Sequence, residues 1–149
     1  HQAHLLGLRP VMTLKTVVGA VRELPEDTAV SYGCTFRTSR PSRIGVLPIG
    51  YADGLHRTLS NRWQVWTPWG TAPIVGRICM DMCMADLTGL PQVREGGEVE
   101  VYGIHNSVND AARLAGTISY ELTCAVSRRV PRVYFRSGRE VARELLLRG

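Results

Sequence analysis

Three short stretches of the sequence place a bulky polar or polarisable side chain beside a glycine. They are Ser31-Tyr32-Gly33, Pro48-Ile49-Gly50-Tyr51-Ala52-Asp53-Gly54 and Pro73-Ile74-Val75-Gly76-Arg77-Ile78-Cys79-Met80-Asp81. Because glycine tolerates positive φ and lets a ligand or another backbone approach closely, these pairs predict side chains displayed at strand ends. A displayed tyrosine can transfer a proton, and an arginine can bind an anion. Taken singly, each stretch also fits an ordinary strand or turn of a small β protein.

A fourth candidate, Tyr120, follows Ser119 at the expected start of a helix. Ser119 is interpreted as the helix cap. The free amides and the dipole at such an end favour an anion, and a phenol hydroxyl can add a donor to a phosphate. The alternative is an aromatic residue at a helix start that covers the core.

The residues after Arg77 alternate in type. If residues 75–87 form one long strand with a bulge at Gly76, then Met80, Met82 and Met84 share one face. A methionine stripe usually packs in a core, so Met82 and Met84 are expected there, with Met80 raised to the rim. The nearby acids have structural interpretations: Asp53 closes a turn through a local bond to backbone, and Asp81 orients its neighbours.

The elements that must position these residues are mostly strands. Alternation, β-branched residues and turn signals predict strands at residues 8–21, 30–36, 44–49, 63–66, 71–74, 75–87, 98–102 and 133–135. Helix signals come late, at residues 107–116 and from Ser119 to before Pro131, and residues 140–147 are expected to form a helical tail. The expected fold is mainly β: a small antiparallel β-barrel with one or two short helices late in the chain.

Length and composition fit one globular domain with a tail. The chain has 149 residues, 44% of them hydrophobic, and no apolar run approaches the roughly 20 residues of a membrane span. With no signal peptide at the start, we expect a cytoplasmic protein. The chain opens on His1 rather than Met, which suggests a piece of a longer protein.

The net charge of +5 comes almost entirely from arginine, since Lys15 is the only lysine among 18 basic residues. A basic excess could indicate nucleic acid binding, but scattered arginines are more typical of a solvated surface. A stacking platform for RNA would need exposed aromatics interleaved with basic residues. Trp63, Trp66 and Trp69, with Arg62, are the candidates, and they are more typical of a hairpin cluster.

Four cysteines, at positions 34, 79, 83 and 124, form no paired C-x-x-C motif. In an intracellular chain we expect buried thiols rather than disulfides. A zinc site from Cys79 and Cys83 with His56 or His105 is conceivable, but the spacing is not that of a usual finger or ribbon. No metal site is therefore predicted.

Five ordered motifs resemble the C-terminal domain of bacterial alanine racemase, from about Leu8 to Phe135. They are Val30-Ser31-Tyr32-Gly33, the stretches from Pro48 to Gly54 and from Pro73 to Asp81, Ile118-Ser119-Tyr120-Glu121, and Arg129-Val130-Pro131-Arg132-Val133-Tyr134. The resemblance divides the chain into a remnant of an interdomain connection (1–7), the β domain (8–136) and a tail (137–149).

The resemblance implies an enzyme that interconverts L- and D-alanine with pyridoxal 5'-phosphate (PLP), for cell-wall peptidoglycan. It works as a head-to-tail homodimer with an N-terminal β/α barrel, and this chain is similar to the second domain alone. Tyr32 would be the catalytic tyrosine, facing the cofactor of the partner subunit. Tyr51 and Met80 would line the substrate pocket, with the Met80 backbone near the substrate carboxylate. Tyr120 would reach the cofactor phosphate.

The resemblance also implies that Arg57 and Arg77 lie in the entrance corridor. The lysine that binds PLP covalently and the arginine beneath its pyridine nitrogen belong to the absent barrel, so the chain alone is expected to be inactive. Lys15 is the alternative candidate for covalent attachment of PLP, but it occupies a position for which the family implies no cofactor role.

Racemisation needs a proton removed from one face of the α-carbon and another returned to the opposite face. The family uses a lysine and a tyrosine for this. A phenol, with an unperturbed pKa of about 10, is a poor base at neutral pH unless cations or donors stabilise its anion. The sequence beside Tyr32 supplies no cation, so these groups are expected from the barrel. The alternatives are a non-catalytic β-barrel that binds RNA or protein, and a serine racemase relative.

Overall fold

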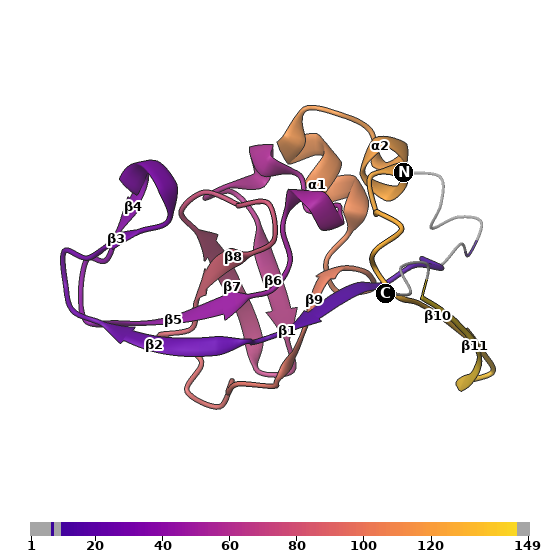
Figure 1. The fold of residues 1–149 in the computed structure, drawn as a ribbon, viewed down its shortest axis with the longest axis horizontal. Helices are drawn as coiled ribbons and strands as arrows, with labels where there is room; N and C mark the ends of the chain where they lie inside the picture. The colour runs from indigo at the N-terminus through magenta and orange to yellow at the C-terminus, as the bar shows by residue number, and fades with distance from the viewer. Residues whose placement is uncertain (1–6, 8–9, 146–149) are drawn as a thin grey trace.

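The computed structural model describes residues 7 and 10–145, and all of its helices and strands lie within them (Figure 1). Seven strands form one antiparallel sheet in the order β1-β9-β6-β7-β8-β5-β2. The strands are β1 (Leu14–Val17), β2 (Ala20–Leu24), β5 (Ser42–Leu47), β6 (Gln64–Thr67), β7 (Gly70–Val75), β8 (Cys83–Asp86) and β9 (Glu98–Tyr102). The sheet curls into a half-barrel, which confirms the mainly β class.

A short arm projects from one end of the sheet (Figure 1). It consists of β3 (Ala29–Val30), the 3-10 turn η1 (Tyr32–Cys34) and β4 (Phe36–Arg37), with β3 and β4 paired antiparallel. The single strand expected over residues 30–36 is therefore wrong. Ser31 has φ +64°, and this left-handed residue turns the chain out of β3.

The strand expected over residues 8–21 is also wrong in extent, because it is broken at Val18 and Gly19. β1 pairs with β9, while β2 pairs with β5 on the opposite edge of the sheet. The break lets one stretch of chain serve both edges. The hairpin of β6 and β7 matches expectation, with Thr67 Oγ1 donating to the Gly70 carbonyl at 2.8 Å to close its turn.

The two late helices are short and lie together at one end of the sheet (Figure 1). They are α1 (Val108–Ala115) and α2 (Ser119–Cys124). Gly116 ends α1 in the left-handed conformation (φ +76°), as its place in the sequence predicts. For α2 the cap residue is Ile118, so the interpretation of Ser119 as the cap is wrong by one position.

The C-terminal part of the domain is a second, separate hairpin of β10 (Arg132–Arg136) and β11 (Arg139–Glu144), and it projects away from the sheet (Figure 1). The helical tail expected over residues 140–147 is therefore wrong as far as Leu145; residues 146–147 lie outside the described part. Ser137 and Gly138 both have positive φ, so they form the tight turn that a helix would not allow.

The main core lies inside the curled sheet and beneath the helices. Trp63 is buried there, with its indole N–H donating to the Val101 carbonyl at 3.0 Å. The fully enclosed aliphatic residues include Leu47, Leu55, Leu59, Ile78, Leu87 and Leu122. Among the described residues, no helix is long and apolar enough to cross a membrane.

Candidate active site

A surface cavity of about 660 Å³ lies between the arm and the loop that joins β7 to β8. Its walls include Tyr32, Tyr51, Arg57, Arg77 and Met80. These are five of the six site residues expected from the sequence, and they come from four separate segments. The fold therefore brings together two phenols, two guanidinium groups and a thioether.

Tyr32 opens the 3-10 turn of the arm, and its side chain is 75% exposed. The preceding residue ties the start of this turn to the β7–β8 loop, because Ser31 Oγ donates to the Arg77 carbonyl at 2.7 Å. Gly76 packs against this point so closely that a Cβ would lie 2.8 Å from Ser31 Cβ. Tyr32 is thus displayed on a tethered turn and is not part of the core.

Tyr51 stands on a second 3-10 turn, η2 (Tyr51–Asp53), which is bound to the β7–β8 loop. The Tyr51 N–H donates to the Cys79 carbonyl, and the Ala52 N–H donates to the Met80 carbonyl, both at 3.0 Å. Asp53 Oδ2 accepts the Gly50 N–H at 2.9 Å, which confirms the turn-closing interpretation of this acid. Tyr51 and the Met80 backbone are consequently held as one unit.

Met80 belongs to a loop and not to a strand. Residues 76–82 separate β7 from β8, so the single long strand expected over residues 75–87 is wrong, and its alternation does not apply. Met80 and Met82 are both exposed, at 51% and 42%, and both line the cavity. Met84 also lines the cavity, and it packs against Val30, Ile44 and Val75, so the expected packing is confirmed for Met84 and wrong for Met82.

The cations of the cavity wall come from this chain. Arg57 lies in η3 (Arg57–Leu59), and Arg77 follows β7. The Arg77 guanidinium packs against the turn that carries Tyr32. A Cβ added to Gly33 of this turn would lie only 3.1 Å from Arg77 Nε. Arg77 is thus a cation of this chain beside the turn of Tyr32, and the supply of the groups that stabilise the Tyr32 anion by the barrel stays a prediction.

Tyr120 lies apart from these residues. It is 76% exposed on α2 and is not among the residues that line the cavity. The five cavity residues and Tyr120 thus belong to two surfaces of the domain.

Arg129 is a residue whose role sequence reasoning missed, although it opens the last motif of the resemblance. Its Nε donates to Asp53 Oδ1 and its Nη2 to Asp81 Oδ1, both at 2.6 Å. Hydrogen bonds and charge from Asp53 and Asp81 raise the pKa of Arg129 further, so the guanidinium stays charged. The expectation that Asp81 orients its neighbours fits this ion pair.

The cysteines are all free thiols, but Cys34 and Cys124 are exposed, so the expectation of buried thiols is wrong for these two. Burial raises the pKa of Cys83 to about 12, with a smaller contribution from Cys79, which keeps Cys83 protonated. Within residues 7 and 10–145, no three His, Cys, Asp or Glu side chains are grouped to hold a metal ion.

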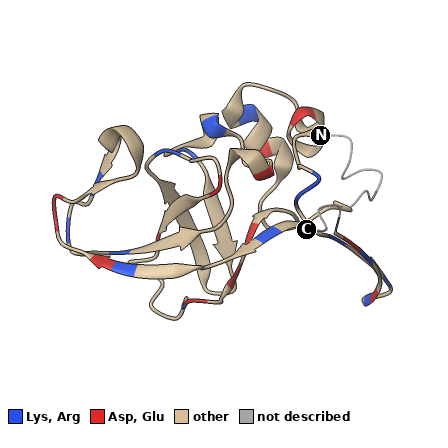
Figure 2. Ribbon diagram, viewed as in Figure 1, with Lys and Arg blue, Asp and Glu red and all other residues tan. Residues whose placement is uncertain are grey.

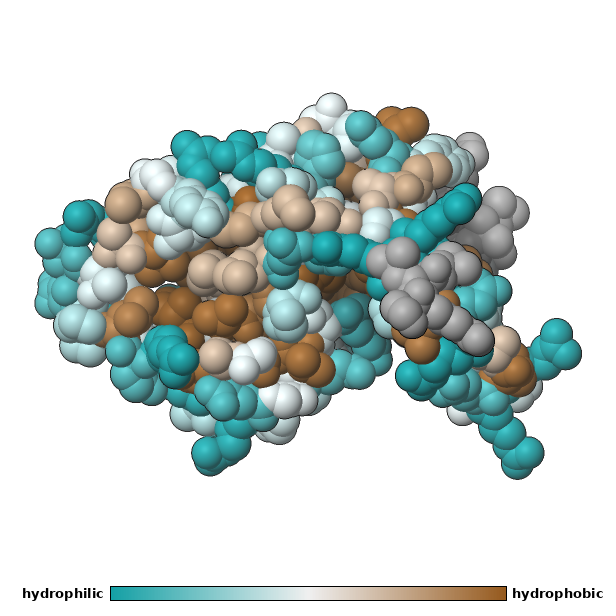
Figure 3. All heavy atoms as spheres, in the orientation of Figure 1, coloured by the Kyte–Doolittle hydropathy of each residue, from teal (hydrophilic) through white to brown (hydrophobic). Residues whose placement is uncertain are grey.

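The tryptophans do not form a stacking platform. Trp63 is in the core, and Trp66 stacks on His105 with 3.6 Å between ring centroids, while Trp69 is exposed. Figure 2 shows basic residues dispersed over the arm, the sheet, α1 and the hairpin of β10 and β11. Figure 3 shows hydrophobic side chains gathered over β2 and β5, rimmed by polar ones.

Residues 11–134 match the family model described as alanine racemase, C-terminal domain. The chain belongs to this family. It is 47% identical to alanine racemase 2 of Caldanaerobacter subterraneus over 138 residues, which are 90% of this chain and 36% of that protein. It is also similar to the solved alanine racemase of Clostridium difficile in complex with cycloserine, with a TM-score of 0.89 and 35% identity over 94% of this chain and 37% of that one.

The domain spans about a third of the length of the curated relatives it matches, with 36% of the first of them covered. A further solved relative is alanine racemase from Bartonella henselae with covalently bound pyridoxal phosphate (TM-score 0.76, 33% identity, 78% of this chain and 33% of that one). The alanine racemase family uses PLP.

The residues that line the cavity are suited to bind a carboxylate, but they do not include an amine that could attach PLP covalently. Two phenols and two guanidinium groups suit an anionic amino acid, but a covalent anchor needs an amine. Lys15 lines a different cavity, and its Nζ lies 2.6 Å from Glu98 Oε1.

Proposed function

We propose that this alanine racemase domain completes a PLP-dependent active site that interconverts L- and D-alanine, and that Tyr32 is its proton-transfer residue. The observation that carries the proposal is the cavity, where Tyr32, Tyr51 and Met80 lie with Arg57 and Arg77 although the sequence separates them by up to 48 positions. An exposed phenol on a tethered turn at this cavity is the arrangement that a proton-transfer residue requires.

PLP, when bound, withdraws electrons from the α-carbon of the amino acid and makes its proton removable. Tyr32 takes or returns that proton at its phenolic oxygen on one face of the α-carbon. A lysine outside this chain does so on the other face. The tether from Ser31 Oγ to the Arg77 carbonyl keeps the phenol in one direction, which proton transfer at a fixed carbon demands.

The other residues of the cavity bind and orient. Tyr51 and Met80 form one wall, with the Met80 backbone beside the substrate carboxylate, and Arg57 and Arg77 flank the entrance. Tyr120 contacts the cofactor phosphate from its separate surface. Because Tyr120 lies apart from the cavity, the two surfaces serve two active sites of a head-to-tail homodimer, each completed by a barrel domain.

The test is Tyr32→Phe in the racemase assembled from this chain and its barrel domain, with PLP present. Loss of the hydroxyl should lower the racemisation rate of L-alanine, followed by optical rotation, by about 10²- to 10⁴-fold, the usual contribution of a general acid or base. Exchange of the α-hydrogen with deuterated solvent should be lost for one enantiomer and kept for the other. This asymmetry follows from one base on each face.

The matched control is Tyr134→Phe, which removes an exposed hydroxyl that donates to Glu144 at 3.2 Å in the C-terminal hairpin. It should racemise at the parental rate. If Tyr32→Phe also kept the parental rate, Tyr32 would have no part in proton transfer, and if the assembled parent protein did not racemise alanine the proposed function would be wrong.

A further inference from the structure

Arg129 joins two loops that the sequence separates. It follows α2, and its guanidinium donates through Nε to Asp53 and through Nη2 to Asp81. Asp53 closes the turn that carries Tyr51, and Asp81 directly follows Met80. One planar side chain thus bridges the two segments that form one wall of the cavity.

The arrangement of the two carboxylates suits a fork-shaped donor. The Asp53 side chain is 14% exposed and already accepts the Gly50 N–H through its second oxygen, so Arg129 occupies its remaining side. The Asp81 side chain is 52% exposed and lines the cavity. Lysine would present a single point charge and could not reproduce this geometry.

The two loops touch through backbone with no space to spare. A Cβ on Gly50 would lie 2.2 Å from the Cys79 carbonyl oxygen and 2.3 Å from that of Met80. A small outward movement of either loop would break the backbone hydrogen bonds of Tyr51 and Ala52 to this segment. Arg129 holds the two loops together from a third segment, the one that follows α2.

Charge is the second consequence of this bridge. Asp81 lies in a cavity whose proposed substrate carries a carboxylate, and an unpaired Asp81 would repel it. Arg129 neutralises Asp81, so the charges of Arg57 and Arg77 can attract the anion. Tyr32 is outside the bridge, because Ser31 ties it to Arg77.

We infer that Arg129 is a positioning residue that fixes the Tyr51–Met80 wall of the cavity and screens Asp81 from the substrate. The effect of Arg129 on kinetics rests on the proposed function. Its effect on the position of the wall does not, and that effect is measurable on this chain alone.

The structural test uses the 149-residue chain with ¹³C-methyl-labelled methionine and ¹⁵N-labelled backbone. In Arg129→Ala, the Met80 methyl signal and the Tyr51 and Ala52 amide signals should shift or broaden, while the amide signals of Thr67 and Gly70 in the hairpin of β6 and β7 stay in place. Arg128→Ala is the matched control, since Arg128 is the adjacent, exposed arginine. It should leave all these signals unchanged.

Two milder variants keep the test decisive if Arg129→Ala does not fold. Arg129→Lys keeps the charge but loses the fork, and Asp81→Asn removes one exposed partner. Both should move the Met80 signal in the direction of Arg129→Ala, by a smaller amount. If the Met80 and Tyr51 signals in these variants matched those of Arg128→Ala, the inference would be overturned.

The kinetic test uses the assembled racemase. Arg129→Ala should raise KM for alanine about tenfold and change kcat less than about threefold, because the bridge serves the binding wall and not the proton-transfer residue. Asp81→Asn in the Arg129→Ala background should recover part of the KM loss by removing the repelling charge. A fall in kcat with unchanged KM would contradict the inference. Absence of racemisation in the assembled parent protein would instead overturn the proposed function and leave the NMR result standing.

Discussion

Ser31 occupies a backbone region that residues with a side chain rarely adopt, directly before the proposed catalytic tyrosine. Its φ is +64° and its ψ is 179°, a combination found mostly for glycine. The serine hydroxyl compensates by donating to the Arg77 carbonyl. The strained residue and its hydrogen bond together set the direction of Tyr32.

Substitution at Ser31 separates these two contributions. Ser31→Gly loses the hydroxyl but accepts the positive φ, whereas Ser31→Ala loses the hydroxyl and keeps the strain. We expect the free energy of unfolding of Ser31→Ala to be lower than that of Ser31→Gly by about 1–3 kcal/mol, measured by urea denaturation.

Ser60 provides the comparison, because its φ is −53° and glycine there gains nothing over alanine. At that position the order should reverse, with alanine the more stable of the two. Equal stabilities of the two Ser31 variants would show that the backbone conformation before Tyr32 carries no cost.

Most cavity residues can be predicted from the sequence because each stands beside glycine or within a recognisable motif. Tyr32, Tyr51 and Arg77 follow that rule. The role of Arg129 cannot be predicted in this way, because its two partners lie 48 and 76 positions away in the sequence and sequence spacing does not reveal such pairs. The expected place of Met82 in the core is wrong because the alternation of a strand does not continue through a loop.

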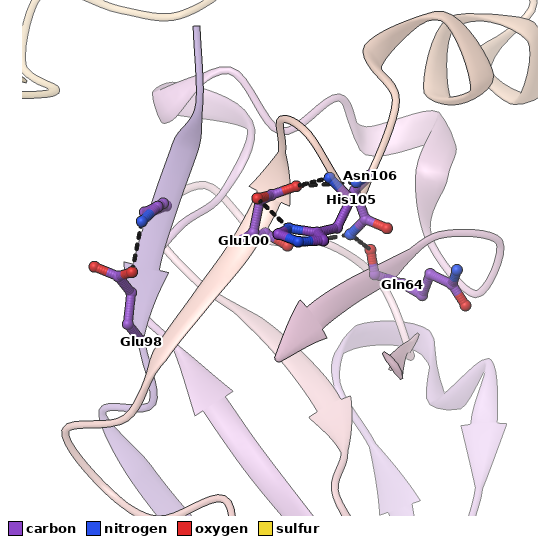
Figure 4. A network of polar contacts seen from close by, with 6 residues as sticks. Gln64, Glu98, Glu100, His105 and Asn106 are labelled. Carbon is purple, nitrogen blue, oxygen red and sulfur yellow. Dashed lines mark hydrogen bonds and ion pairs between the residues drawn. The ribbon is translucent and has the colours of Figure 1, made fainter. Parts of the chain in front are cut away.

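At the scale of elements, a buried acid shapes the connection from β9 to α1 (Figure 4). Glu100 is 5% exposed and accepts the backbone N–H groups of His105 and Asn106 at 2.7 and 2.9 Å. Its second oxygen lies 3.0 Å from His105 Nδ1. The side-chain amide of Asn106 donates to the backbone carbonyls of Gln64 and Glu100. The carboxylate thus organises the turn that precedes the helices.

This network predicts how stability depends on pH. Burial alone would raise the pKa of Glu100, but the hydrogen bonds from the His105 side chain and from the backbone of Asn106 and His105 hold it below its ordinary value. Because the folded pKa is lower than the unfolded one, the stabilisation is complete above about pH 4.3 and is lost as pH falls through the folded pKa.

Glu100→Gln should therefore lower the free energy of unfolding at pH 7 by about 1–3 kcal/mol, since the amide fails to satisfy the converging donors. The difference from the parent should shrink on acidification, as the parent loses its own stabilisation. Unfolding curves recorded from pH 7 down to pH 3 would test this. Glu98→Gln, at a carboxylate 64% exposed, is the control and should differ little from the parent. A difference independent of pH would refute the role of the charge.

Element types are predictable where local signals are complete. The hairpin of β6 and β7 and the helix α1 have turn or cap residues at both ends, and both predictions are confirmed. Residues of the arm and of the β7–β8 loop favour strands, but close contacts between Gly76 and Val30 impose turns instead. The residues of β11 favour a helix, and the expectation of a helical tail left out the Ser137-Gly138 pair, a turn signal whose positive φ values make a hairpin there.

At the scale of the whole molecule, the domain presents its proposed site outward. Tyr32 and Tyr120 are both more than 70% exposed, and the cavity opens to solvent between the arm and the β7–β8 loop. Both phenols are therefore accessible to groups from outside this domain, as the proposed function requires. The resemblance implies a site divided between two domains, because it places the lysine that binds PLP in the absent barrel.

The chain alone should consequently neither retain PLP covalently nor racemise alanine. Its single lysine, Lys15, lies in β1 and pairs with Glu98 at 2.6 Å, on a different cavity from Tyr32. After incubation with PLP, dialysis and only then reduction with borohydride, mass spectrometry should find the Lys15 peptide unmodified at PLP concentrations that label the assembled racemase fully. Lys15→Ala sets the background. A stoichiometric adduct on Lys15 that is lost in Lys15→Ala would mean that this domain carries its own cofactor anchor, because a stable adduct requires a site that shields it from hydrolysis.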